Sequence, residues 1–134
     1  MNIGAICVAI LALALLGSAQ VPAHAQSQVK VVGSEKLPNV PGKSVTAVVV
    51  TFPPGVKSSP HRHAGSVLVY VLSGEVRSEN SATGPAKVYK TGETFFEPAG
   101  STHLVSENAS ATEPATILAV FVADDGATLT TRDQ

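Results

Sequence analysis

The chain has 134 residues and a formal net charge of −1, with 44% hydrophobic residues, 4% aromatic residues and no tryptophan. This length fits a single domain, and the near-neutral charge gives no electrostatic case for a nucleic acid or an anionic membrane as partner. The one cysteine, Cys7, excludes a disulfide framework within the chain.

The first 25 residues predict an export signal. Residues 3–19 are all apolar or small, a run slightly short for a membrane span, and Ala23 and Ala25 form an A-x-A cleavage pattern. We therefore expect cleavage of a signal peptide over residues 1–25 and a periplasmic or secreted protein with no stable membrane insertion. Residues 1–5 contain no lysine or arginine, so a retained membrane anchor is the alternative.

After residue 25 the chain alternates between β-branched or apolar runs and glycine or proline breaks. Residues 26–44 are predicted to be a polar lead-in with at most one short edge strand, over residues 29–32. Residues 124–134 form a polar tail that we expect to be frayed. Between these segments the predicted strands cover residues 45–52, 66–72, 75–77, 88–90, 94–97, 103–106 and 116–122.

This strand pattern predicts an all-β fold. No window after residue 25 has the i, i+3, i+4, i+7 apolar spacing of a helix. Short strands separated by glycine and proline at regular intervals are typical of a β-sandwich or a β-barrel, and we assign this domain to residues 45–123.

His61 and His63 form a candidate metal site. Because side chains alternate along a strand, the two imidazoles share one face while Arg62 points to the other. Two neutral imidazoles placed in this way can bind one metal ion. For a His-x-His pair on its own, the alternative is a surface strand with two solvated histidines.

Two spaced motifs in this chain resemble those of the cupin superfamily. They comprise Gly55, His61, His63 and Gly74, followed by Gly92, Pro98, Gly100 and His103. The resemblance implies a double-stranded β-helix, or jelly roll, with a divalent metal inside the barrel bound by His61, His63 and His103. Iron, manganese, zinc, nickel and copper all suit such a site. The resemblance also implies a homodimer, and the glycines are expected in turns that need a positive φ.

The chain departs from the cupin pattern at two positions. Val67 stands where the superfamily has an acidic ligand, and Glu107 stands at an asparagine position, with Asn108 one residue further. Without that acid, three neutral imidazoles leave a divalent ion with its full +2 charge. Such a site favours an anionic ligand that can occupy the open positions of the ion.

Glu97 is the candidate substitute for the missing acid, as a metal ligand, as a partner of a ligating histidine or as a general base. The alternative is a solvated glutamate at the end of a strand. Tyr70 and Phe96 are expected in the core or in the wall of the pocket rather than in catalysis.

These features predict an exported, metal-dependent dioxygenase, or a related lyase or isomerase, that acts on a small anionic organic molecule. A non-catalytic module that binds a metal or a small ligand is the second hypothesis. A structural or regulatory barrel without a metal is the third, because one fold hosts many activities.

Overall fold

The structure, a computed structural model, describes residues 26–132, which form strands and loops and contain no helix. The predicted all-β class is confirmed. The strands are β1 (Gln28–Lys36), β2 (Lys43–Phe52), β3 (Lys57–Ser58), β4 (His61–His63), β5 (Ser66–Ser73), β6 (Glu75–Asn80), β7 (Gly84–Lys90), β8 (Thr94–Glu97), β9 (Thr102–Asn108), β10 (Ala115–Asp124) and β11 (Thr130–Arg132).

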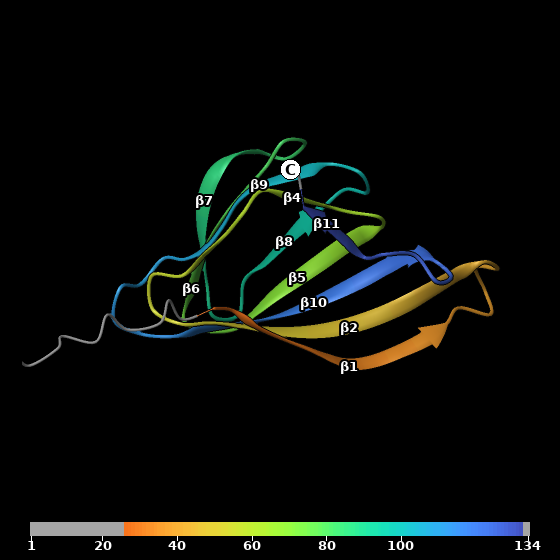
Figure 1. The fold of residues 1–134 in the computed structure, drawn as a ribbon, viewed down its shortest axis with the longest axis horizontal. Helices are drawn as coiled ribbons and strands as arrows, with labels where there is room; N and C mark the ends of the chain where they lie inside the picture. The colour runs from red at the N-terminus through yellow and green to blue at the C-terminus, as the bar shows by residue number, and fades with distance from the viewer. Residues whose placement is uncertain (1–25, 133–134) are drawn as a thin grey trace, which may run out of the picture.

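The strands form two antiparallel sheets that close over one another as a jelly roll (Figure 1). The first sheet has the order β1-β2-β10-β5-β8. The second has the order β11-β4-β9-β6-β7, with β3 paired to β9. From β5 to β10 the chain passes repeatedly from one sheet to the other, which brings sequence-distant strands side by side. The predicted double-stranded β-helix is confirmed by this arrangement.

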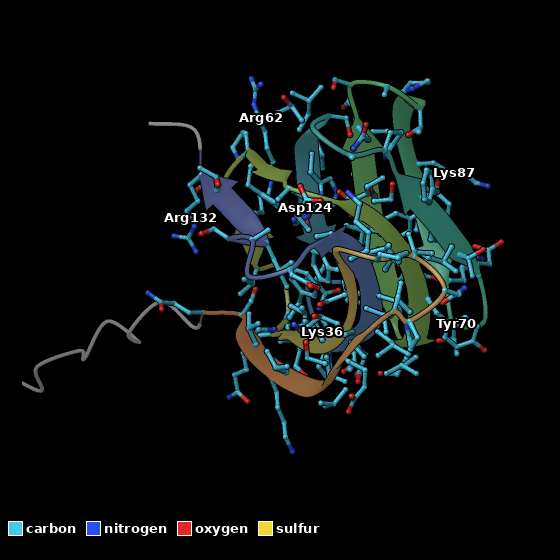
Figure 2. All side chains as sticks on the ribbon, turned by 90° about the vertical axis from the view of Figure 1, so that its right-hand side faces the viewer. Lys36, Arg62, Tyr70, Lys87, Asp124 and Arg132 are labelled. Atoms are coloured by element: carbon cyan, nitrogen blue, oxygen red, sulfur yellow. The ribbon has the colours of Figure 1, made fainter. Side chains whose placement is uncertain are left out.

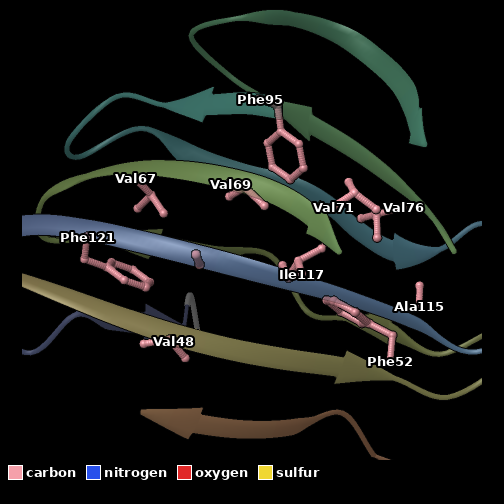
Figure 3. Close-up of a cluster of buried hydrophobic side chains, with 11 residues drawn as sticks. Val48, Phe52, Val67, Val69, Val71, Val76, Phe95, Ala115, Ile117 and Phe121 are labelled. Atoms are coloured by element: carbon pink, nitrogen blue, oxygen red, sulfur yellow. The ribbon is translucent and has the colours of Figure 1, made fainter. Parts of the chain in front are cut away.

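The core lies between the two sheets (Figure 3). On β5, Val67, Val69 and Val71 are buried, and they alternate with exposed Leu68, Tyr70 and Leu72. The facing residues of β10 and β2 add aromatic and aliphatic side chains to the same cluster. Because side chains alternate along a strand, every second residue of β5 is buried and the residues between them are exposed.

Tyr70 and Phe96 lie on the outer face of the first sheet, so their predicted place in the core or pocket wall is wrong. Tyr70 projects from the surface in Figure 2. The prediction failed because β5 is apolar at almost every position, and its composition alone does not say which face is buried.

The two ends of the described chain are more ordered than predicted. Nearly every residue of β1 pairs with β2, with a register shift between Val31 and Gly33, so this strand is longer than the predicted residues 29–32. The predicted frayed tail is wrong over β11, which pairs with β4. The predicted signal peptide, residues 1–25, lies outside the described residues. Within those described, no helix is long and apolar enough to span a membrane.

The turn role of the four motif glycines is confirmed. Their φ angles lie between 67° and 89°, a range that L-residues with a side chain rarely adopt. These glycines hold the corners between strands and contribute no side chain to the site.

Candidate metal centre

The structure brings His61, His63 and His103 together inside the barrel. His61 and His63 lie on the inner face of β4, and His103 lies near the start of β9, where it pairs in register with His61. One ring nitrogen from each histidine lies within 4.8 Å of the other two. Histidines that are distant in the chain thus converge because β4 and β9 are neighbours in the second sheet.

The Nδ1 atoms of His61 and His63 face away from this cluster and are held by the backbone. His61 Nδ1 lies 2.8 Å from the carbonyl oxygen of Ser59, and His63 Nδ1 lies 3.1 Å from that of Leu129. A carbonyl only accepts, so each Nδ1 carries the proton and donates it. Each Nε2 therefore presents a free lone pair to the cluster, as a metal ligand requires.

Ser78 holds the third histidine. Its hydroxyl oxygen lies 2.8 Å from His103 Nε2, and both residues are buried. This contact turns His103 Nδ1 toward the cluster. Ser78 was not among the predicted site residues, since the strand predicted there ended at residue 77. Its only local signal is a serine at an inward position of β6, between Val76 and Asn80.

A buried carboxyl group lies next to Val67, which stands at the acidic position of the cupin pattern. The residue that carries it, Glu97, is the direct neighbour of Val67 across β8 and β5. Glu97 Oε2 lies 3.0 Å from His103 Nδ1 and 3.5 Å from His63 Nε2. The side chain is only 3% exposed, so the alternative of a solvated glutamate at a strand end is wrong.

Two of these inward atoms have no hydrogen-bond partner among the described residues. Glu97 Oε2 and His103 Nδ1 are close, but they are not aligned for a hydrogen bond. Buried polar atoms are almost always paired, because leaving them unpaired costs roughly 1–3 kcal/mol. Divalent transition metals are bound by combinations of imidazole nitrogen and carboxylate oxygen. These two atoms, together with the two imidazole lone pairs, fit such a donor set.

Burial lowers the pKa of His61 and of His63 below the ordinary value of 6.5. Desolvation is the largest cause for both; the charge of His103 lowers both pKa values further, and that of His63 lowers the pKa of His61. The nearby Glu97 and the backbone contacts act in the opposite direction but are outweighed. Both rings are therefore neutral near pH 7, the state that binds a metal ion.

A cavity of about 740 Å³ opens onto this centre. The three histidines and Glu97 form one part of its wall, and apolar side chains from β1, β2, β5 and β10 form much of the rest. A ligand in this cavity can therefore reach the inward atoms of the cluster.

Asn108 has a structural role. Its side-chain nitrogen donates to the carbonyl oxygens of Phe52, Pro53 and Glu113 at 2.8–3.2 Å, while its oxygen accepts from the backbone of Ser110. The shift of this asparagine by one residue from the cupin pattern thus leaves a buried amide that ties two loops together. Asn108 is not among the residues that line the cavity.

A profile of the Cupin domain family matches residues 48–121, which is more than half of the chain. A curated relative, Germin-like protein subfamily 2 member 2 of Arabidopsis thaliana, is 33% identical over 91 residues. That match covers 65% of this chain and 41% of the relative, so the chain spans less than half the length of that relative.

Two solved structures extend the comparison. A protein of Klebsiella pneumoniae with a double-stranded β-helix domain has a TM-score of 0.63 and 23% identity, and the match covers 85% of this chain and 90% of that one. Oxalate decarboxylase of Bacillus subtilis, a protein with Mn(II) centres, has a TM-score of 0.55 and 25% identity, over 66% of this chain and 23% of that one. With its two-sheet jelly roll, its spaced histidines and a family match over most of the barrel, this chain belongs to the cupin family.

Proposed function

We propose that the protein binds a divalent transition metal through His61, His63 and His103, with Glu97 as the fourth protein ligand. The observation that carries this proposal is that two buried atoms without a hydrogen bond, Glu97 Oε2 and His103 Nδ1, lie 3.0 Å apart beside two imidazole lone pairs. A bound carboxylate reduces the formal charge of the centre from +2 to +1, which three imidazoles alone do not. The Mn(II) centres of a structurally similar decarboxylase support the proposal.

The centre is proposed to serve an enzyme, a metal-dependent dioxygenase or a related lyase or isomerase that acts on an organic anion. A bound metal would supply Lewis acidity at its open positions. The protein contributes a buried set of ligands fixed by Ser59, Leu129 and Ser78. The surrounding cavity has largely apolar walls, and these exclude water and strengthen electrostatic interactions with a bound anion.

Metal analysis of the native protein tests the first part of this proposal. Protein purified from the exported fraction is expected to carry about one metal per chain, and the variant with His61→Ala and His63→Ala is expected to lose it. The identity of the metal, among iron, manganese, zinc, nickel and copper, follows from the same measurement. Metal far below one per chain that the double substitution leaves unchanged would contradict the proposed site.

Turnover is tested separately. Oxygen uptake by Fe(II)-loaded protein is measured with a panel of β-diketones, catechols and thiol acids, and products are analysed to detect lyase or isomerase activity. Oxygen uptake or a new product with one class of compound supports the proposal that the protein is an enzyme. Neither uptake nor product with any class supports the non-catalytic module that binds a metal or a small ligand.

We also propose that the protein is exported and acts in the periplasm or outside the cell. The apolar run and the A-x-A pattern before residue 26 support this location. Mass spectrometry of the mature protein is expected to find Gln26 at its amino terminus. An intact amino terminus in a membrane fraction would instead support a retained anchor.

A further inference from the structure

We infer that the ligand of this site is an amphiphilic organic anion, with an oxygen-donor head group at the histidine cluster and an apolar body of drug size along β1, β2 and β10. The placement of the head group rests on the proposed metal function. The placement of the body rests on the cavity wall alone. The inferred ligand is larger and more apolar than the small anion that the sequence predicts.

The size of the cavity is the first observation. A volume of about 740 Å³ lies in the upper part of the range of about 300–1,000 Å³ that is typical of sites for drug-sized ligands. A dicarboxylate of a few carbons would fill only a small part of it. Most of the apolar wall would then stay in contact with water, which is unfavourable in proportion to its area.

The inner faces of two central strands form a continuous apolar wall. Val48 and Val50 of β2 and Ile117 and Ala119 of β10 all line the cavity. Val50 pairs in register with Ile117, and Val48 pairs with Ala119. The wall therefore extends across both strands with no polar side chain between these four positions, and it suits a hydrocarbon or aromatic body.

The edge strand β1 extends this wall toward solvent. Val29 pairs with Val50, and Val31 pairs with Val48, so both valines continue the same rows of the sheet. Both line the cavity, yet they are 68% and 59% exposed. Each valine exposes apolar surface to water, and removing that surface from water is favourable. An apolar ligand body in the cavity would cover it.

Charge around the cavity favours an anion. Among the described lining residues Glu97 is the one acidic side chain, and it belongs to the metal centre. Arg132 lines the cavity from β11 and pairs in register with His61, so alternation places both side chains on the same face of the sheet. Figure 2 shows Arg132 at the end of β11. A positive side chain on the side of the cluster favours a ligand with a negative head group.

Two probe series test the body and the head separately. In metal-free protein, n-alkanols from butanol to decanol are expected to bind with an affinity that rises by about fourfold per methylene until the wall is covered. In Co(II)-loaded protein, the alkanoates from butanoate to decanoate are expected to follow the same slope. The alkanoates should also change the visible absorption spectrum of the Co(II) when their carboxylate binds the metal. Both series are measured by calorimetry, the alkanols below their solubility limit and the alkanoates below their micellar concentration.

Adjacent valines provide a matched pair of variants. Val31→Gln is expected to weaken decanoate binding by roughly five- to tenfold while leaving butanoate binding within about twofold. Val32→Gln changes a neighbour that is 51% exposed and absent from the cavity lining, and it should change neither. Equal losses in the two variants would overturn the proposed wall.

The outcomes distinguish this inference from the proposed function. Affinities that do not depend on chain length in either series would overturn the apolar body, whatever metal the protein binds. A slope with the alkanols but no gain from cobalt and no spectral change with the alkanoates would overturn the placement of the head group. That second result would count against the metal function as well.

Discussion

At the scale of single residues, the proposed metal centre takes its carboxyl group from the strand next to the one that carries the acidic position of the cupin pattern. Val67 occupies the acidic position of the cupin pattern, but its neighbour across the sheet is Glu97. The carboxyl oxygen still reaches His103 at 3.0 Å. An adjacent strand can supply a lost ligand because paired residues on neighbouring strands have side chains only about 5 Å apart on the same face.

Glu97→Gln is predicted to weaken metal binding by at least about tenfold, because the amide keeps the shape of the side chain but not its charge. Competitive titration of the metal-free protein with Zn(II) measures the change. Glu107→Gln is the matched control, since Glu107 pairs with Arg77 and Lys57 and is not among the residues that line the cavity, so this variant should bind metal as the unmodified protein does. Unchanged affinity in Glu97→Gln would remove Glu97 from the ligand set.

Ser78 is predicted to position His103. Ser78→Ala removes the hydroxyl that holds Nε2, so the ring is free to turn, and metal affinity should fall by about tenfold or more. Ser106→Ala is the control because Ser106 is a buried serine paired directly with Ser78 across β9 and β6. If both variants lose affinity equally, the effect comes from packing and not from the orientation of His103.

The stability of the metal-free protein is predicted to fall on acidification. His61 and His63 have a pKa below 6.5 in the folded state, so the unfolded chain binds protons first as the pH falls through that value. More protons on the unfolded state mean that stability decreases with decreasing pH. The thermal midpoint should drop between about pH 7.5 and about pH 5.5, and less so with His61→Gln and His63→Gln combined. A parallel dependence in that variant would contradict this assignment.

At the scale of secondary-structure elements, the corner between β5 and β6 depends on Gly74. Its φ is +72°, and an added Cβ would lie 2.6 Å from the carbonyl oxygen of Pro114 and 2.9 Å from Ala115 Cα. Both neighbours are backbone atoms and cannot rotate away. This corner therefore needs glycine for two independent reasons, the dihedral angle and the lack of space.

Gly74→Ala is predicted to lower the free energy of unfolding by about 3 kcal/mol, the sum of a left-handed backbone and a steric clash. Gly55→Ala separates the two terms, because Gly55 has φ +67° but no atom within 4 Å of an added Cβ. That control should cost about 1 kcal/mol. Urea unfolding measures both variants, and equal losses would mean that the crowding at Gly74 is relieved by movement of β10.

At the scale of the whole molecule, the outer face of the first sheet is an uncovered apolar surface. Its exposed members include Leu68, Tyr70, Leu72 and Phe96, and the outward positions from Thr116 to Val122 continue it across β10. None of these outward residues is charged. With strands about 4.8 Å apart, the face covers on the order of 400 Å², the size of the largest apolar patch on a typical monomer, which is often functional.

We propose that a second copy of this chain covers this face. The part of this face on β5, β8 and β10 is uncharged, so two copies of it meet without like-charge repulsion, and aligned sheets pack well face to face. The charged pair at its end, Lys43 with Asp124, combines both signs, whereas an anionic membrane would need a basic rim. The proposed homodimer therefore uses the face of the sheet and not its edges.

Light scattering after size exclusion is predicted to give a dimer for the unmodified protein and a monomer for Leu68→Lys, because a buried, unpaired charge opposes association. Leu104→Lys is the control, since Leu104 is also exposed but lies on β9 of the other sheet. A monomeric unmodified protein, or a dimer that survives Leu68→Lys, would contradict this interface.

The sequence by itself determined the all-β class, the turn glycines and the three histidines. These features depend on local periodicity and on the spacing of a few residues, which are visible along a single chain. The same local signals predicted the face shared by His61 and His63.

Only the tertiary structure decided which carboxyl group joins the histidines, which hydroxyl orients His103 and which face of β5 is buried. Each of these depends on the register between strands that are distant in the chain, as for Val67 with Glu97 and for Ser78 with His103. Register follows from the packing of both sheets together, and a strand that is apolar on both faces carries no local record of it.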